Sequence, residues 1–350
     1  MPCDMRSSTR GFRRYYNPDV GDAVRMDTNT NVLGSNPAAT RFLKEFKGEI
    51  NDYPNTYSDG LRDALAELYG LNRENFVAGS GSDELLDISF KTFTEWGDWA
   101  AVPVPSYTLY DYFVKMNGGS VNEVDLTEDF QIDVDAFVST GSKIMIAPSP
   151  NNPTGNCFRQ KDLEELLVRF DGVVIVDEAY AEYSGKGMIG KVNEFDNLIV
   201  LRTFSKAYAM AGLRVGYAAA CEDLADKMNK VKIPYSLNMV SEGAAIAALK
   251  DQDFIGRSVD LVKKERPVLT KGLKKLGFEP FPSDSNFILM RSPVDHACLV
   301  NGLKEKGVLI RDFGSKRRTE NCVRTTVGTR ELNDLLLERA GEVIEDCRSK

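Results

Sequence analysis

A lysine in a loop of small residues is the side chain best placed to act as a nucleophile. Lys206 follows an apolar run, residues 198–201, which predicts a buried strand. A lysine at the end of a buried strand must be desolvated or paired, and it can form a Schiff base with a carbonyl cofactor. A loop lysine beside a helix is the alternative, and the segment alone supports both interpretations about equally.

Hydroxyl groups and an arginine accompany this lysine. Thr203 and Ser205 precede it, and Arg214 follows eight positions later. These side chains could hold a phosphate group together, because a guanidinium offers phosphate two parallel N–H donors.

Two upstream segments end in side chains that suit an aromatic cofactor. Residues 172–177 predict a strand that ends in Asp177, and a buried carboxylate needs a cationic or hydrogen-bonding partner such as a protonated pyridine nitrogen. Residues 143–147 predict another strand that runs into a rigid, proline-rich turn with Asn152, whose amide can bond a phenolate oxygen. A capping or ion-paired Asp177 and an ordinary loop at Asn152 are the alternatives.

A glycine turn before a helix is a candidate phosphate site. Residues 76–85 predict a short strand, a turn with Gly81, Ser82 and Asp83, and the start of a helix. Backbone N–H groups at a helix N-terminus bind phosphate, and glycine permits a close approach. The pattern is no dinucleotide fingerprint, because no acidic residue follows at the required distance. Ser82 or Asp83 as a simple N-cap is compatible with this role.

An aromatic residue follows a further strand. Residues 99–105 predict the strand, and the face of Tyr107 can stack on a flat pyridine ring. Tyr110 lies one helical turn later, and we expect it to pack in the core.

These segments, in this order, resemble the fold-type-I, pyridoxal 5'-phosphate (PLP)-dependent aminotransferases of class I and II. The matching motifs are SPNNPTG at 149–155, DEAY at 177–180, RTFSKA at 202–207 and AGLR at 211–214. More narrowly, the chain resembles the histidinol-phosphate aminotransferase group, from about residue 29 to residue 330.

The resemblance implies a role for each matching residue around the cofactor ring. Lys206 would bind PLP covalently and then move a proton as base and acid, while Asp177 would keep the ring nitrogen protonated. Asn152 and Tyr180 would bond the phenolic oxygen, and Tyr107 would stack on the ring.

The resemblance also implies a phosphate site that two subunits share. Gly81, Ser82, Asp83, Thr203, Ser205 and Arg214 would hold the PLP phosphate in one subunit of a homodimer. Tyr53 would reach the same phosphate from the partner subunit. By sequence alone, a surface aromatic beside a proline is the favoured interpretation of Tyr53.

Substrate binding is implied for Arg324, Arg311 and Asn29. The two arginines would suit a phosphorylated amine in one half-reaction and a glutamate carboxylate in the other. A surface ion pair with Asp312 or Glu305 is the alternative for Arg311. Thr30, next to Asn29, stands where the family has a glutamate.

The first 25 residues are polar and aromatic and predict an arm and not a packed domain. The resemblance implies that this arm lies over the active site. Tyr15 or Tyr16 could cover the site, and the sequence does not choose between them.

Composition narrows the function classes. The chain has 350 residues, 42% hydrophobic and 27% charged, with a net charge of −8 and no long basic run, which argues against a nucleic-acid partner. No stretch is apolar enough for a membrane span or a signal-peptide core. Six cysteines form no C-x-x-C pair, which predicts reduced thiols in a cytoplasmic protein. The single histidine, His296, argues against a Ser-His-Asp triad and histidine-based metal chemistry, so we expect no metal.

The expected fold is α/β. We predict a large PLP-binding domain at 41–250, with a mostly parallel central sheet flanked by helices, and a smaller α+β domain at 251–350. Residues 1–40 would form the N-terminal arm and part of the small domain. A long helix over 252–275 would link the domains.

Three functions compete. The first is transamination of a phosphorylated amino compound, most simply histidinol phosphate with 2-oxoglutarate or glutamate in histidine biosynthesis, and it includes an aromatic or other amino-acid aminotransferase. The second is a PLP-dependent lyase that resembles threonine-phosphate decarboxylase. The third is a cofactor-binding regulator, for which the short N-terminal arm leaves no room for a DNA-binding helix-turn-helix.

Overall fold

The structure of the protein is a computed structural model that describes residues 4–14 and 21–349. Tyr15 and Tyr16, the two candidates for covering the site, lie outside the described residues.

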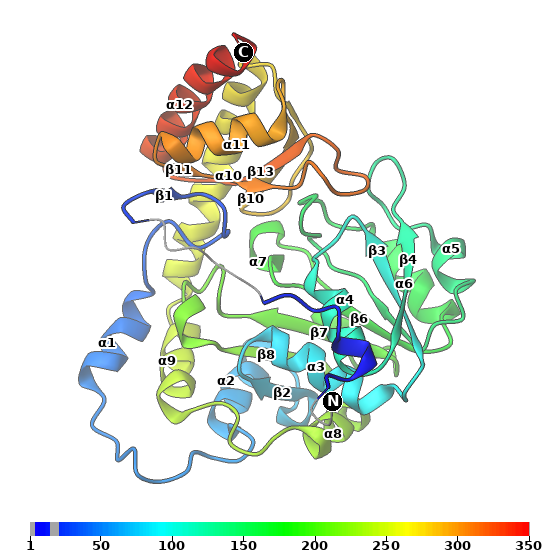
Figure 1. The fold of residues 1–350 in the computed structure, drawn as a ribbon. Helices are drawn as coiled ribbons and strands as arrows, with labels where there is room; N and C mark the ends of the chain where they lie inside the picture. Colours follow the sequence, from blue (N-terminus) through cyan, green and yellow to red (C-terminus); the bar gives the residue numbers. More distant parts are fainter. Residues whose placement is uncertain (1–3, 15–20, 350) are drawn as a thin grey trace.

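A seven-stranded sheet forms the centre of the larger part of the molecule (Figure 1). Its order is β2-β8-β7-β6-β5-β3-β4, and β8 alone runs antiparallel to its neighbours. The strands are β2 (Phe76–Gly79), β3 (Trp99–Val104), β4 (Ser120–Asp125), β5 (Ile144–Ile146), β6 (Val173–Asp177), β7 (Leu198–Thr203) and β8 (Gly216–Ala220). The prediction of a mostly parallel central sheet is confirmed.

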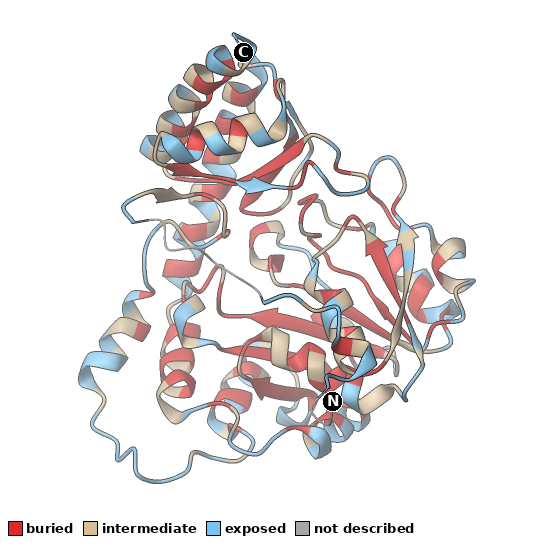
Figure 2. Cartoon of the chain, viewed as in Figure 1, coloured by how far each residue is buried: buried red, intermediate tan, exposed pale blue. Residues whose placement is uncertain are grey.

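Helices cover both faces of this sheet. Its central strands are buried throughout (Figure 2). Successive side chains of a strand point to opposite faces of the sheet: Ile175 packs in one apolar cluster, and Val174 and Val176 pack in the other. The helices of this part are α2 (Asp59–Tyr69), α3 (Ser82–Phe93), α4 (Leu109–Met116), α5 (Val134–Val138), α6 (Gln160–Arg169), α7 (Ala181–Ser184), α8 (Glu222–Val231) and α9 (Met239–Leu249).

The C-terminal part has its own small sheet, in the order β12-β13-β10-β9. The strands are β9 (Glu279–Pro280), β10 (Phe287–Arg291), β12 (Arg311–Asp312) and β13 (Cys322–Thr326). The helices packed with them are α10 (Gln252–Lys275), α11 (His296–Glu305) and α12 (Arg330–Arg348). The long linking helix is confirmed as α10, which contains Pro267 and reaches from the large part into the small one (Figure 1).

The N-terminal segment pairs with the small part. β1 (Val24–Arg25) runs parallel to β11 (Val308–Leu309) in a separate two-stranded sheet. Residues 308–312 therefore form two short strands and not one continuous strand: β11 pairs with β1, and β12 pairs with β13 after the buried Ile310. The remaining elements are α1 (Pro37–Glu45) and 3-10 turns at Ser7–Thr9, Arg73–Asn75, Ile189–Lys191 and Ala211–Leu213.

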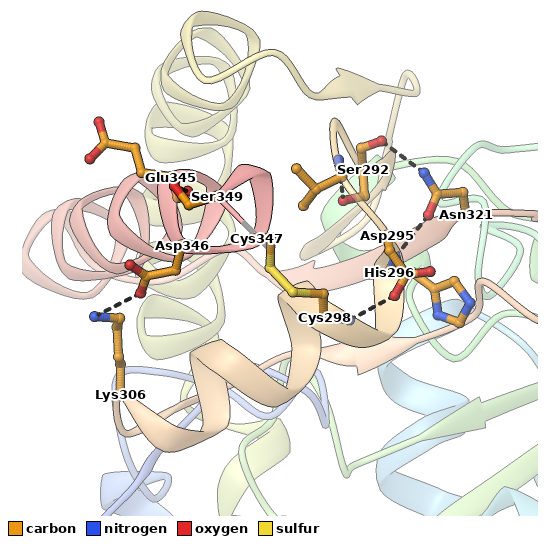
Figure 3. The surroundings of a disulfide bond; sticks show 11 residues. Ser292, Asp295, His296, Cys298, Lys306, Asn321, Glu345, Asp346, Cys347 and Ser349 are labelled. Atoms are coloured by element: carbon orange, nitrogen blue, oxygen red, sulfur yellow. Dashed lines mark hydrogen bonds and ion pairs between the residues drawn. A yellow bond between two sulfur atoms is a disulfide. The ribbon is translucent and has the colours of Figure 1, made fainter.

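A disulfide joins Cys298 in α11 to Cys347 in α12 (Figure 3). The two helices pack side by side, so residues 49 positions apart lie with their Cα atoms 6.2 Å from each other. The expectation that the cysteines are reduced is wrong for this pair, because helix packing and not sequence spacing brings them together. Among the cysteines that the structure describes, Cys157, Cys221 and Cys322 form no disulfide.

Across residues 4–14 and 21–349, no helix combines the length and the apolarity needed to cross a membrane.

Candidate active site

A cavity of about 360 Å³ lies between the large and small parts. Its walls include the residues that follow β3, β5, β6 and β7, together with residues of β12 and β13. The carboxyl ends of parallel strands meet at one edge of a sheet, so segments far apart in sequence converge there.

Most predicted site residues line this cavity. They are Asn29, Ser82, Asp83, Tyr107, Asn152, Asp177, Tyr180, Thr203, Ser205, Lys206, Arg214, Arg311 and Arg324. Gly81 lies directly behind the wall, against the Arg214 side chain. Tyr53 is not part of this cavity.

Lys206 projects from the loop after β7. Its ammonium nitrogen donates a hydrogen bond to the Thr28 carbonyl oxygen at 3.0 Å and lies 5.5 Å from the centroid of the Tyr180 ring. The predicted nucleophile therefore lies inside the cavity, close to two of its walls, and is not a surface lysine.

Asp177 is the last residue of β6, and each of its carboxylate oxygens accepts a hydrogen bond. The Tyr110 hydroxyl donates to Oδ2 at 2.7 Å, and the Ala179 amide donates to Oδ1 at 3.1 Å. Burial raises the pKa of Asp177 to about 6, while these two hydrogen bonds oppose that rise. Tyr110 packs in the core as expected, but its bond to Asp177 was not predicted, although its position one helical turn after Tyr107 was a usable signal.

The side-chain amide of Asn29 is buried beside the Tyr180 hydroxyl. Asn29, which is 1% exposed, donates from Nδ2 to the Tyr180 oxygen at 3.1 Å. Thr326 and Asn286 bond the Asn29 backbone and hold it in a left-handed conformation with φ of 54°. The Asn29 amide thus faces Tyr180, and a direct substrate contact stays a prediction.

A cluster of donors surrounds the N-terminus of α3. The Arg214 guanidinium donates to the Ser205 hydroxyl at 3.2 Å and pairs with Asp83 at 3.2 Å. The Ser205 hydroxyl in turn lies 3.0 Å from that of Thr203. Gly81, the residue before α3, has φ of 84°, and a Cβ there would lie 2.6 Å from an Arg214 nitrogen. Only glycine therefore fits between this helix and the guanidinium.

Arg324 links the two parts of the molecule. Its guanidinium donates to the Asn152 side-chain oxygen and to the Asp27 carbonyl, the latter at 2.7 Å. The rings of Phe287 and Phe313 lie 5.0 and 5.4 Å from its central carbon. These two hydrogen bonds and two ring contacts fix the position of the Arg324 guanidinium at the cavity wall.

Arg311 stands next to a cation that sequence analysis missed. Lys316 lies on the loop between β12 and β13 and lines the same cavity. Partial burial and the nearby Arg311 both lower the pKa of Lys316. Among the described residues, neither side chain has an ion-pair partner; Asp312, one of the alternatives for Arg311, contacts His296 at 2.9 Å. The loop shows no strand or helix pattern, so only its folded path reveals Lys316.

Tyr53 lies on the surface. It is 76% exposed and stacks on Tyr235 with ring centroids 4.8 Å apart.

The comparisons with known proteins agree with this geometry. Residues 22–339 match the family model of class I and II aminotransferases. Similar relatives are the histidinol-phosphate aminotransferases of Thermoanaerobacter pseudethanolicus, 35% identical over 97% of this chain and 98% of the relative, and of Pyrococcus furiosus, 40% identical over 87% and 88%.

A similar solved structure is the histidinol-phosphate aminotransferase from Sinorhizobium meliloti in complex with pyridoxal-5'-phosphate. It superposes with a TM-score of 0.87 at 25% identity, covering 93% of this chain and 91% of that one. With the family model matching most of its length, the chain belongs to the class I and II aminotransferases.

Proposed function

We propose that this aminotransferase uses PLP to transfer the amino group of histidinol phosphate, with 2-oxoglutarate and glutamate as the second pair. The observation that supports it most is a cavity lined by a lysine, a buried aspartate and two cations, Arg311 and Lys316, that form no ion pair with any residue the structure describes. The relatives of that name support the choice of substrate.

The residues present fit PLP. A phosphate needs N–H and O–H donors and a close backbone approach, and the N-terminus of α3 offers these beside Ser205 and Arg214. The glycine at 81 leaves room for the guanidinium, where any Cβ would displace it. Ser82 and Thr203 complete the proposed phosphate site from the same cavity.

At the ring end, this chain supplies one acid and two hydrogen-bonding groups. When bound, PLP supplies an aldehyde that accepts the amino group and a pyridine ring that withdraws electrons. Asp177 would face the ring nitrogen as a carboxylate, Tyr180 and Asn152 would bond the phenolic oxygen, and Tyr107 would stack on the ring.

Lys206 would carry the proton. Its amine would take the proton from the substrate carbon that bears the nitrogen and would deliver it to the carbon of the cofactor's aldehyde group. The Thr28 carbonyl, 3.0 Å away, accepts a hydrogen bond from this amine and holds it at the cavity wall when it is not covalently engaged.

The substrate phosphate would lie against Arg311 and Lys316. A phosphate monoester carries nearly two negative charges at neutral pH, which suits two cations that have no counter-ion within the described part of the chain. Arg324 would bind the carboxylate of glutamate, because its guanidinium is held in place by Asn152 and the Asp27 carbonyl.

Single-turnover spectroscopy of the PLP-loaded protein tests this proposal. Histidinol phosphate, histidinol, phosphothreonine, glutamate and phenylalanine are offered one at a time. We expect rapid loss of the cofactor absorption band with histidinol phosphate and glutamate, and a much slower loss with histidinol. Conversion by phenylalanine but not by histidinol phosphate would indicate an aromatic aminotransferase, and release of CO₂ from phosphothreonine would indicate a decarboxylase.

Two variants separate the roles in that experiment. Lys206→Ala should abolish the absorption band and turnover. Lys316→Met should raise KM for histidinol phosphate about tenfold or more, because a charged hydrogen bond contributes about 1.5–3 kcal/mol, and should leave KM for glutamate nearly unchanged. Equal effects on both substrates would argue against a phosphate site at Lys316.

We also propose a homodimer in which Tyr53 reaches the phosphate site of the partner subunit. Its support is the stacked pair that Tyr53 forms with Tyr235, because both aromatic rings are exposed to water. Mixing inactive Tyr53→Ala and Lys206→Ala proteins tests this idea. If Tyr53 acts across subunits, each hybrid dimer contains one intact site and activity returns; if it acts within its own chain, the mixture stays inactive.

A cytoplasmic location completes the proposal, because phosphorylated amines and 2-oxo acids are charged metabolites that do not cross membranes unaided. The Cys298–Cys347 disulfide is the observation against it, since cytosolic disulfides are rare outside hyperthermophiles. Alkylation of thiols in intact cells, before lysis, shows whether this pair is reduced where the protein works.

A further inference from the structure

Tyr110 connects two walls of the cofactor pocket. Its side chain is 1% exposed, and its hydroxyl donates to Oδ2 of Asp177 at 2.7 Å. Its ring also meets the ring of Tyr107 edge-on, with centroids 5.4 Å apart. Tyr107 follows β3 and Asp177 ends β6, so one side chain of α4 sets the position of both groups relative to each other.

The direction of the Tyr110 hydrogen bond favours a charged Asp177. The hydroxyl donates to Oδ2, and a donated hydrogen bond stabilises the ionised form of a carboxylate. The Ala179 amide donates to the other oxygen at 3.1 Å, so each carboxylate oxygen already accepts one hydrogen bond from the protein. Burial and the neighbouring carboxylates of Asp83 and Glu178 act in the opposite sense and raise the pKa of Asp177.

We propose that Tyr110 is a positioning residue that keeps Asp177 ionised, so that a proton shared between Asp177 and the cofactor ring nitrogen resides on the nitrogen. This inference rests on the proposed function, because it needs a pyridine ring beside Asp177. A carboxylate that accepts a hydrogen bond is less basic, and it therefore leaves the shared proton on its partner. A protonated ring withdraws electrons more strongly, which speeds proton removal from the substrate carbon.

Tyr110→Phe removes the hydroxyl and keeps the ring that packs on Tyr107. The variant and the wild type are loaded with PLP labelled with ¹⁵N in the ring, and the ¹⁵N chemical shift is followed across neutral pH alongside kcat and KM. We expect a protonated nitrogen in the wild type and a shift toward the unprotonated value in the variant. We expect kcat to fall about tenfold, the effect of losing one hydrogen bond to a charged group, while KM changes little.

Tyr183→Phe is the matched control. Tyr183 is equally buried, and its hydroxyl has Ser258, 3.5 Å away, as its neighbour in place of Asp177. A general cost of deleting a buried hydroxyl would alter both variants, whereas the proposal predicts that the ¹⁵N shift and kcat of Tyr183→Phe match those of the wild type.

If Tyr110→Phe does not fold, a second pair of variants tests the inference, one with a hydrogen-bond donor at position 110 and one without. Tyr110→Gln can still donate an N–H to Asp177 and should keep the ring nitrogen protonated, whereas Tyr110→Leu should not. An unchanged ¹⁵N shift and kcat in the non-donor variants would overturn the inference about Tyr110 and leave the proposed function standing. A wild-type protein that binds no PLP would overturn the proposed function itself.

Discussion

Replacing Gly81 by alanine should weaken PLP binding without unfolding the protein. Gly81 has φ of 84° and ψ of 165°, a region of backbone space that is essentially restricted to glycine and costs another residue about 1–3 kcal/mol. The added Cβ would also lie 2.6 Å from Nη2 of Arg214. The guanidinium must therefore move away from the N-terminus of α3, where we place the cofactor phosphate.

The expected loss follows from that displacement. A hydrogen bond to a charged group contributes about 1.5–3 kcal/mol, so losing the Arg214–phosphate contact should raise the Kd for PLP by about 10- to 150-fold. Titration of the cofactor-free protein with PLP, followed by absorbance, measures this Kd, and circular dichroism monitors the fold. Gly190→Ala is the control, because a Cβ there meets no atom within 4 Å, and its Kd should match that of the wild type.

A double-mutant cycle with Arg214→Met identifies the cause. If Gly81→Ala acts by displacing the guanidinium, it should add little to the Kd of the Arg214→Met protein. A well-folded Gly81→Ala protein with unchanged Kd would refute the reasoning, and fully additive effects would show that Gly81 acts independently of Arg214.

Three further outcomes follow from the described contacts. Reduction of Cys298–Cys347 should lower the free energy of unfolding by about 4 kcal/mol, given a sequence separation of 49; urea unfolding with and without reductant measures this, and Cys298→Ser should not respond to reductant. Burial raises the pKa of Asp177 from 3.8 to about 6, so the folded state keeps this proton to a higher pH than the unfolded state, and the contribution of Asp177 to stability falls as pH rises from about 4 to 6 and is constant above. In cofactor-free unfolding experiments, Asp177→Asn should lack this decline. Wild-type and variant stabilities that change in parallel with pH would contradict the assignment. Arg202→Met leaves Glu178 buried without its 2.7 Å partner and should destabilise the protein by about 3–5 kcal/mol in the same assay, whereas a loss below 1 kcal/mol would show that water reaches the carboxylate.

The cavity residues that sequence analysis found share one property: each lies next to a strongly patterned strand or turn. Lys206 and Asp177 lie at the ends of apolar runs that predict buried strands, and the carboxyl ends of such strands in a parallel sheet meet at one edge. Periodicity and local motif therefore place these side chains in one site before any coordinates are known.

Other features depended on contacts between distant segments. Tyr110 reaches Asp177 across 67 positions, and Lys316 lines the cavity only because its loop folds back over it. Residues 308–312 look like one strand because pairing partners leave no local signature, yet β11 and β12 join different sheets.

The sequence by itself determined the family, the α/β sheet and the chemistry at its edge, because strand periodicity and short motifs are local properties of the chain. The tertiary structure alone decided which groups touch. The Cys298–Cys347 bridge, the Asn29–Tyr180 bond and the bond to Asp177 all arise from packing between separate elements, and a contact of that kind depends on the relative placement of whole helices and strands.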